Sequence, residues 1–94
     1  MTSKQRAFLR SLANSQDPIL HIGKEDISDT LLKQADDALT ARELIKARVL
    51  ETCAQTPKEA AITVAHRTKA EIVHVIGRTF VLYRKNLKEP KIKF

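Results

Sequence analysis

A short apolar run that ends in glycine and lysine is the feature that most constrains the fold of this chain. The run covers residues 19–22, Gly23 and Lys24 follow it, and a helical pattern begins a few residues later. A strand, a tight loop and a helix in this order predict an α/β arrangement. Such a loop can present backbone N–H groups to a phosphate. Glu25 and Asp26 come next, and their carboxylates oppose the binding of an anion there.

The chain is expected to form one domain, residues 1–94, with a modest core. Hydrophobic residues make up 43% and charged residues 30%, which is typical of a folded chain. No apolar run approaches the roughly 20 residues of a membrane span, so we expect no membrane contact. The N-terminus lacks an apolar signal segment, and the single cysteine, Cys53, has no internal disulfide partner. We therefore expect a cytoplasmic protein, and we expect it to be a monomer.

Caps and apolar periodicity predict three helices. Residues 2–5 (Thr-Ser-Lys-Gln) form a capping box before the first helix. Ser28 or Asp29 can cap the second helix, unless Asp26 caps it. A second capping box at residues 56–59 begins the third helix, which runs to about residue 68. The apolar positions expected on the inner faces of the first two helices are Phe8, Leu9, Leu12, Ala13, Leu31, Leu32, Ala35, Ala38 and Leu39.

Residues 43–50 alternate between apolar and polar side chains, which is the pattern of a strand with one buried face. The face expected to be buried carries Ile45, Ala47 and Val49. Lys46 and Arg48 lie on the opposite face. That basic face either lines an RNA path or is an ordinary polar surface, open to solvent or covered by a helix.

A β-hairpin is expected near the C-terminus. Residues 72–76 and 79–84 are rich in strand-forming side chains, and Gly77-Arg78 between them suits a type II′ turn. The element order is then α-β-α-β-α-β-β. This order predicts an α+β two-layer sandwich, in which helices pack on a four-stranded mixed sheet. Residues 85–94 remain as a basic tail that either pairs as an edge or stays loose.

The charge is positive and unevenly distributed. Seventeen Lys and Arg against eleven Asp and Glu give a formal net charge of +6. Residues 78–94 contain six basic residues and one glutamate, whereas residues 25–43 contain six acidic and two basic residues. A polarised charge of this kind favours one binding face for a polyanion, RNA or DNA above all.

The candidate RNA-binding residues come from four segments. They are Lys4, Arg6 and Arg10 of the first helix, Gly23, Lys24 and Asp26 of the loop, Lys46 and Arg48 of the alternating strand, and Arg78, Arg84, Lys85, Lys88 and Lys91 near the C-terminus. The C-terminal group is expected to contribute most of the binding. Aromatic residues are few: Phe8 and Phe80 are expected in the core, and Tyr83 half-buried. Recognition is therefore expected to depend on the RNA backbone and shape more than on bases.

Nothing in the sequence predicts catalysis. His21, His66 and His74 are far apart and lack metal-ligand spacing, and the two strand histidines among them are expected to be packed. Cys53 has no supporting nucleophile motif, and neither a Walker loop nor a dinucleotide fingerprint is present. We expect no enzyme activity, no metal and no cofactor.

Four stretches together resemble one known family. They are residues 2–13 (TSKQRAFLRSLA), 22–24 (IGK), 41–49 (ARELIKARV) and 75–84 (VIGRTFVLYR). In this order they are similar to the CRM domain (chloroplast RNA splicing and ribosome maturation) in its stand-alone bacterial, YhbY-like form. The resemblance implies an RNA-binding module similar in fold to the C-terminal domain of bacterial translation initiation factor three. It also implies a role with ribosomal RNA in assembly of the large (50S) subunit, with ribosomal proteins as possible further partners.

The family has a Gly-x-x-Gly loop after its first strand, loosely like the RNA-clamping loop of KH domains. Gly23 and Lys24 match this pattern, but Asp26 occupies the second glycine position. The resemblance therefore implies an RNA-binding loop at residues 23–26, but one that binds RNA more weakly than the Gly-x-x-Gly loop of the family. Two other functions remain open from the sequence: a basic nucleoid or DNA-binding protein, and a protein-interaction module on the ribosome.

Overall fold

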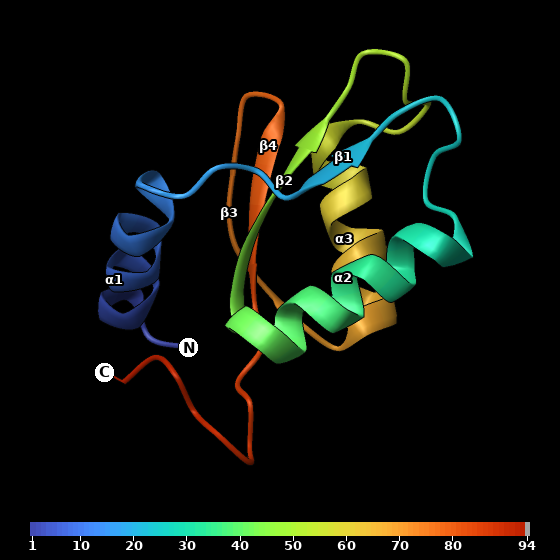
Figure 1. Ribbon diagram of the computed structural model, residues 1–94. Helices are drawn as coiled ribbons and strands as arrows, with labels where there is room; N and C mark the ends of the chain where they lie inside the picture. Colours follow the sequence, from blue (N-terminus) through green and yellow to red (C-terminus); the bar gives the residue numbers. More distant parts are fainter. Residues whose placement is uncertain (94) are drawn as a thin grey trace.

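Within residues 1–93, three helices and four strands follow one another in the predicted order (Figure 1). The computed structural model describes residues 1–93. The elements are α1 (Ser3–Asn14), β1 (Leu20–Ile22), α2 (Asp29–Arg42), β2 (Leu44–Val49), α3 (Pro57–Thr68), β3 (Glu71–Ile76) and β4 (Thr79–Tyr83). The fold class predicted from the sequence is confirmed.

The four strands form one mixed sheet in the order β1-β2-β4-β3. The β1–β2 pair is parallel, and β4 runs antiparallel to both β2 and β3. Helices α2 and α3 cover one face of the sheet, whereas α1 lies on the other (Figure 1). The helix α1 thus adds a third layer to the two that the sequence predicts.

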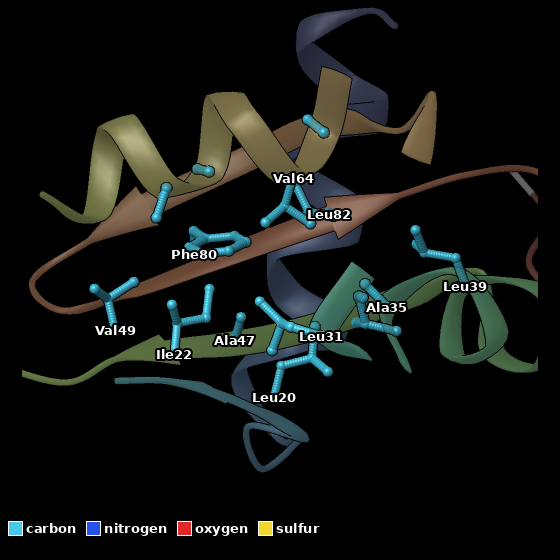
Figure 2. Close-up of a cluster of buried hydrophobic side chains, with 14 of the residues drawn as sticks. Leu20, Ile22, Leu31, Ala35, Leu39, Ala47, Val49, Val64, Phe80 and Leu82 are labelled. Atoms are coloured by element: carbon cyan, nitrogen blue, oxygen red, sulfur yellow. The ribbon is translucent and has the colours of Figure 1, made fainter. Parts of the chain in front are cut away.

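The larger core lies between the sheet and helices α2 and α3 (Figure 2). Phe80 at its centre is fully buried, as predicted. The alternation in β2 is also confirmed, because its three apolar positions point into this core. The labelled side chains of Figure 2 are Leu20, Ile22, Leu31, Ala35, Leu39, Ala47, Val49, Val64, Phe80 and Leu82.

A smaller core joins α1 to the opposite face of the sheet. Its buried members are Leu9, Ala13, Leu44, Val73, Val81 and Tyr83. Phe8, which the sequence places in the core, is 42% exposed, so that prediction is wrong. Successive residues of a helix are turned by about 100°, so Phe8 lies outside the narrow stripe through Leu9 and Ala13. Tyr83 is more deeply buried than predicted, at 7% exposure.

The ends of the elements follow their local chemistry. Both predicted capping boxes form, with Thr2 and Thr56 as N-caps. Ser28 caps α2 by accepting a hydrogen bond of 3.1 Å from the Leu31 N–H, so the alternative in which Asp26 caps this helix is wrong. Gly77 has a φ of +56°, as the first central residue of the predicted hairpin turn requires.

Candidate nucleic-acid interface

The loop after β1 is held against the segment that follows β2. A Cβ at Gly23 would lie 3.2 Å from both the Leu50 Cδ1 and the Thr52 Oγ1, so a side chain there would require these two neighbours to shift slightly. The Asp26 N–H donates to the Gly23 carbonyl over 2.9 Å, and Asp26 has a φ of +59°. One loop amide is therefore used within the loop and is not available to a phosphate.

The Asp26 side chain also has an internal partner. The Cys53 Sγ donates to the Asp26 Oδ1 over 3.4 Å. Burial raises the pKa of the Cys53 thiol, and Asp26 contributes further to that rise. The thiol therefore stays protonated and remains a donor to the carboxylate, so Asp26 is a structural part of this loop.

The loop end of the molecule has no excess of free positive charge. A groove beside the loop is lined by His21, Gly23, Lys24, Glu25, Asp26, Ser28, Thr30, Leu31, Gln34 and Leu50. Lys24 is its one basic residue apart from the histidine, and Glu25 and Asp26 line the same groove. Arg78 lies at this end too, but its guanidinium donates to the carbonyls of Val49 (2.7 Å) and Leu50 (2.9 Å).

Arg84 occupies the opposite end of β4 and is also used internally. Its guanidinium forms a salt bridge with Asp36 over 2.6 Å and donates to the Thr40 hydroxyl and the Thr68 carbonyl, at 2.9 and 2.8 Å. These partners belong to the C-terminal halves of α2 and α3, where carbonyl groups carry partial negative charge. Arg84 therefore ties the two helix ends to the sheet and offsets their charge.

The C-terminal tail neither pairs as an edge strand nor stays loose over its described residues; it docks on Glu43. This glutamate is fully buried, and its carboxylate accepts from the N–H groups of Asn86 (2.7 Å), Lys91 (2.6 Å) and Ile92 (2.7 Å). Burial by itself raises the pKa of Glu43, but the three donors and the Lys91 charge outweigh burial, so the pKa lies below its ordinary value. Phe94 lies outside the described residues.

Docking of the tail creates a basic surface between the ends of α2 and α3. An open concavity of about 660 Å³ lies there. Its wall includes four basic residues that we call the tail-end cluster: Arg67, Lys69, Lys85 and Lys88. All four are exposed, and none forms a salt bridge within residues 1–93. Asp36 also lines the concavity, but Arg84 already pairs with it.

The basic residues of α1 and β2 are divided between inward and outward positions. Arg6 donates to the carbonyls of Ile72 and Val73, and the Lys46 ammonium lies 3.5 Å from the Ala13 and Gln16 carbonyls. The basic face of β2 is thus partly covered by a helix, as one of the two alternatives anticipated. The candidates left exposed across residues 1–93 are Lys4, Arg10, Lys24, Arg48, Lys85, Lys88 and Lys91.

The structure does not bring all candidates to one surface. Arg78 and Arg84 flank the five residues of β4, so their Cα atoms lie about 20 Å apart at the usual rise of a strand. Sequence reasoning missed Arg67 and Lys69, and it missed the role of Glu43. The sequence shows Arg67 and Lys69 as basic residues at the end of the third predicted helix, but their nearness to the tail depends on the tertiary fold.

Other kinds of site are not found in the described part of the chain. No group of three or more His, Cys, Asp or Glu side chains could hold a metal ion. No helix within residues 1–93 has the length and apolar character needed to cross a membrane. His74 is half-buried, whereas His21 is exposed on its strand, so the expectation that both are packed is wrong for His21.

Comparison with known proteins places this geometry in a family. A Bacillus subtilis protein named "Probable RNA-binding protein YqeI" is 38% identical over 93 residues, covering 99% of this chain and 97% of the relative. An "RNA-binding protein" of Haemophilus influenzae is 32% identical over 93 residues, covering 99% and 93%. The solution structure of a hypothetical protein from Staphylococcus aureus matches with a TM-score of 0.78 and 45% identity, covering 99% of each chain.

The family model for the CRS1 / YhbY (CRM) domain matches residues 1–84. The match includes the sheet and all three helices, and it ends at Arg84, where the docked tail begins. The family predicted from four short stretches is therefore confirmed over most of the chain. This protein belongs to the CRS1/YhbY family of CRM-domain proteins.

Proposed function

We propose that this protein binds RNA, that its target is ribosomal RNA in precursors of the large subunit, and that it assists their assembly in the cytoplasm. The observation that carries the proposal is the tail-end cluster, four exposed cations around one concavity without internal ion pairs in residues 1–93. Relatives named as RNA-binding proteins support RNA as the polyanion. The resemblance to the bacterial YhbY-like proteins supports the ribosomal target.

Binding proceeds by capture of phosphates on a prearranged cationic surface. Glu43 fixes the backbone of residues 86–92, so Lys85 and Lys88 are displayed from an ordered segment rather than a flexible one. Ordering before binding reduces the entropy lost on association. Phosphate contacts of this kind set position and affinity but do not identify bases. Specificity then comes from RNA shape and from neighbouring ribosomal proteins.

The salt dependence of RNA binding tests the cluster. We compare Lys85→Ala/Lys88→Ala with Lys33→Ala/Lys58→Ala, which removes the same charge from exposed positions on the outer sides of α2 and α3. The first pair is expected to lower affinity for a structured RNA hairpin in fluorescence anisotropy. It should also reduce the slope of log K against log salt by about 1.4–1.8, because each lost phosphate contact is worth about 0.7–0.9. Equal slopes for the two variants would overturn the assignment.

Sedimentation in a gradient tests the ribosomal role. Tagged protein in a lysate is expected to migrate with large-subunit precursors and to leave them when the tail-end cluster is neutralised. Its absence from every ribosomal particle would contradict the assembly role while leaving RNA binding intact. Equal affinity for duplex DNA and structured RNA would favour the nucleoid alternative. Retention on particles after the cluster is neutralised would favour contact with ribosomal proteins.

A further inference from the structure

One row of side chains crosses all four strands on the α1 face of the sheet. Its members are paired in register: His21 with Arg48, Arg48 with Thr79, and Thr79 with Ile76. Paired residues on neighbouring strands project from the same face. Strands lie about 4.8 Å apart, so the row is about 14 Å long. We call these four residues the sheet row.

Helix α1 covers the adjacent row but ends before the sheet row. The neighbouring row contains Lys46 and Val81, which are paired in register. Val81 is buried against α1, and Lys46 reaches the carbonyls at the C-terminal end of that helix. One row further along, Arg48 and His21 are exposed, Ile76 is 61% exposed, and Thr79 between them is half-buried. The sheet row is therefore an open strip of pleated surface beside a helix end.

The sheet row itself carries the positive charge of Arg48 and no carboxylate. Helix α1 ends beside the row and contains no acidic residue, and its exposed Arg10 is in the half of the helix nearest that end. Glu71 is on the same face, but it lies at the opposite end of β3, 4.0 Å from the N-terminal amine. Glu25 and Asp26 lie at the β1 edge of the row, in the groove that His21 also lines, and the Asp26 carboxylate accepts from the Cys53 thiol. The part of the strip around Arg48, away from these carboxylates, is therefore the part that suits a phosphate.

We propose that the sheet row binds unpaired nucleotides of single-stranded RNA, which extends the proposed RNA binding to a second surface of the molecule and rests on it. Arg48 meets a phosphate, and the His21 ring and the Ile76 side chain meet the face of a base. Imidazole rings, guanidinium planes and apolar side chains on an open sheet suit contact with splayed bases. A duplex keeps its bases stacked, so it contacts the tail-end cluster without gaining from the row.

The test compares single-stranded with duplex RNA. Arg48→Ala and Ile76→Thr are measured by anisotropy against a 12-nucleotide strand without self-complementarity and against its duplex. The controls are Lys33→Ala and Ile62→Thr; Ile62 is a 51% exposed isoleucine on α3. Threonine keeps the β-branched side chain that suits a strand. We expect each row variant to bind the single strand about five- to tenfold more weakly and the duplex within about twofold, with the controls unchanged.

A crosslinking experiment provides a second readout that does not depend on affinity. A single strand carrying 4-thiouridine is expected to crosslink to peptides that contain His21 or Ile76 in the wild-type protein. Crosslinks confined to the tail, or equal losses on both RNAs, would overturn the proposal for the sheet row. Unchanged RNA binding with altered self-association of the Ile76→Thr variant would assign the strip to protein contact instead. If wild-type protein binds neither RNA, the proposed function itself fails.

Discussion

The two ends of β4 differ in how their cations are used. Each end carries an arginine that the sequence marks as a phosphate ligand, and each arginine instead donates to groups within the protein: Arg78 to the end of β2, and Arg84 to α2 and α3. Beyond the arginines the ends diverge. At the loop end Lys24 shares its groove with two carboxylates, whereas at the tail end the four residues of the tail-end cluster remain without ion pairs in residues 1–93.

The difference shows that the number of basic residues does not give the positive charge available to a partner, because some basic residues are paired within the protein. The planar, multiply donating guanidinium suits carbonyls and carboxylates at the junction of elements, so arginines at such junctions stabilise the fold. Lysines have a flexible stem and a compact charge, and here most stay in solvent. A net charge of +6 therefore describes the chain, whereas the cations left after internal pairing are the charge that is available to a partner.

The largest effect that separates the two ends is expected from Glu43→Ala. The substitution leaves the three N–H groups that Glu43 binds without their acceptor and releases the tail. We expect the free energy of unfolding to fall by about 2–4 kcal/mol in urea denaturation. Hydrogen exchange should accelerate at the amides of Asn86, Lys91 and Ile92, while the loop end stays unchanged. Protected tail amides in the variant would contradict the proposed docking.

The same carboxylate predicts an acid sensitivity. Because hydrogen bonds and Lys91 lower the pKa of Glu43 in the folded state, its contribution to stability is complete above the unfolded value, about 4.3. That contribution is lost as the pH falls through the lower folded value. Stability measured from pH 6 downward should therefore decline less steeply in Glu43→Gln than in the wild type. Parallel curves would show that another group is responsible.

The two arginines give the next largest effect. Arg84→Lys keeps the charge but loses the forked contacts to Asp36, Thr40 and the Thr68 carbonyl. We expect a loss of about 1–3 kcal/mol in the free energy of unfolding. RNA affinity of the folded protein should stay within about twofold.

Arg78→Lys is the matched variant at the loop end, with two carbonyl contacts to lose rather than a network, so a loss of about 1–2 kcal/mol is expected. Urea denaturation measures the free energy of unfolding, and anisotropy at low denaturant measures the RNA affinity of the folded protein. A fivefold loss of RNA affinity with native stability in either variant would support the prediction that this arginine is a phosphate ligand.

Local signals in the sequence were sufficient to predict the helices, the strands and their order. Capping boxes at Thr2 and Thr56, the alternation in β2 and the glycine turn at Gly77 each act over a few residues, and all four are confirmed. Phe8 shows where this reasoning ends. Its spacing fits an apolar stripe, but the width of the surface that α1 buries depends on the sheet beneath it.

The candidate site was harder to predict from the sequence because it depends on contacts between distant segments. Nothing local distinguishes Arg84 from Lys85, although the first is bound to residues 36, 40 and 68 and the second is exposed. Glu43 looks like one more residue of an acidic segment until the tail is seen to fold onto it. The sheet row combines residues from four strands, and only the register brings them together.

The smallest effect is expected from Asp26→Gly, which makes the loop end more like the tail end. Glycine adopts the φ of +59° without the cost that a side chain adds there, and this offsets the lost contact with the Cys53 thiol. Removing the charge should tighten RNA binding about two- to fivefold at low salt, with the gain shrinking as salt screens it. Asp26→Asn removes the charge but keeps a side chain that tolerates this conformation. If both variants tighten binding, the carboxylate is what holds RNA away from Lys24; if both weaken it, Asp26 has a positive role, and the two ends are more alike than their charges suggest.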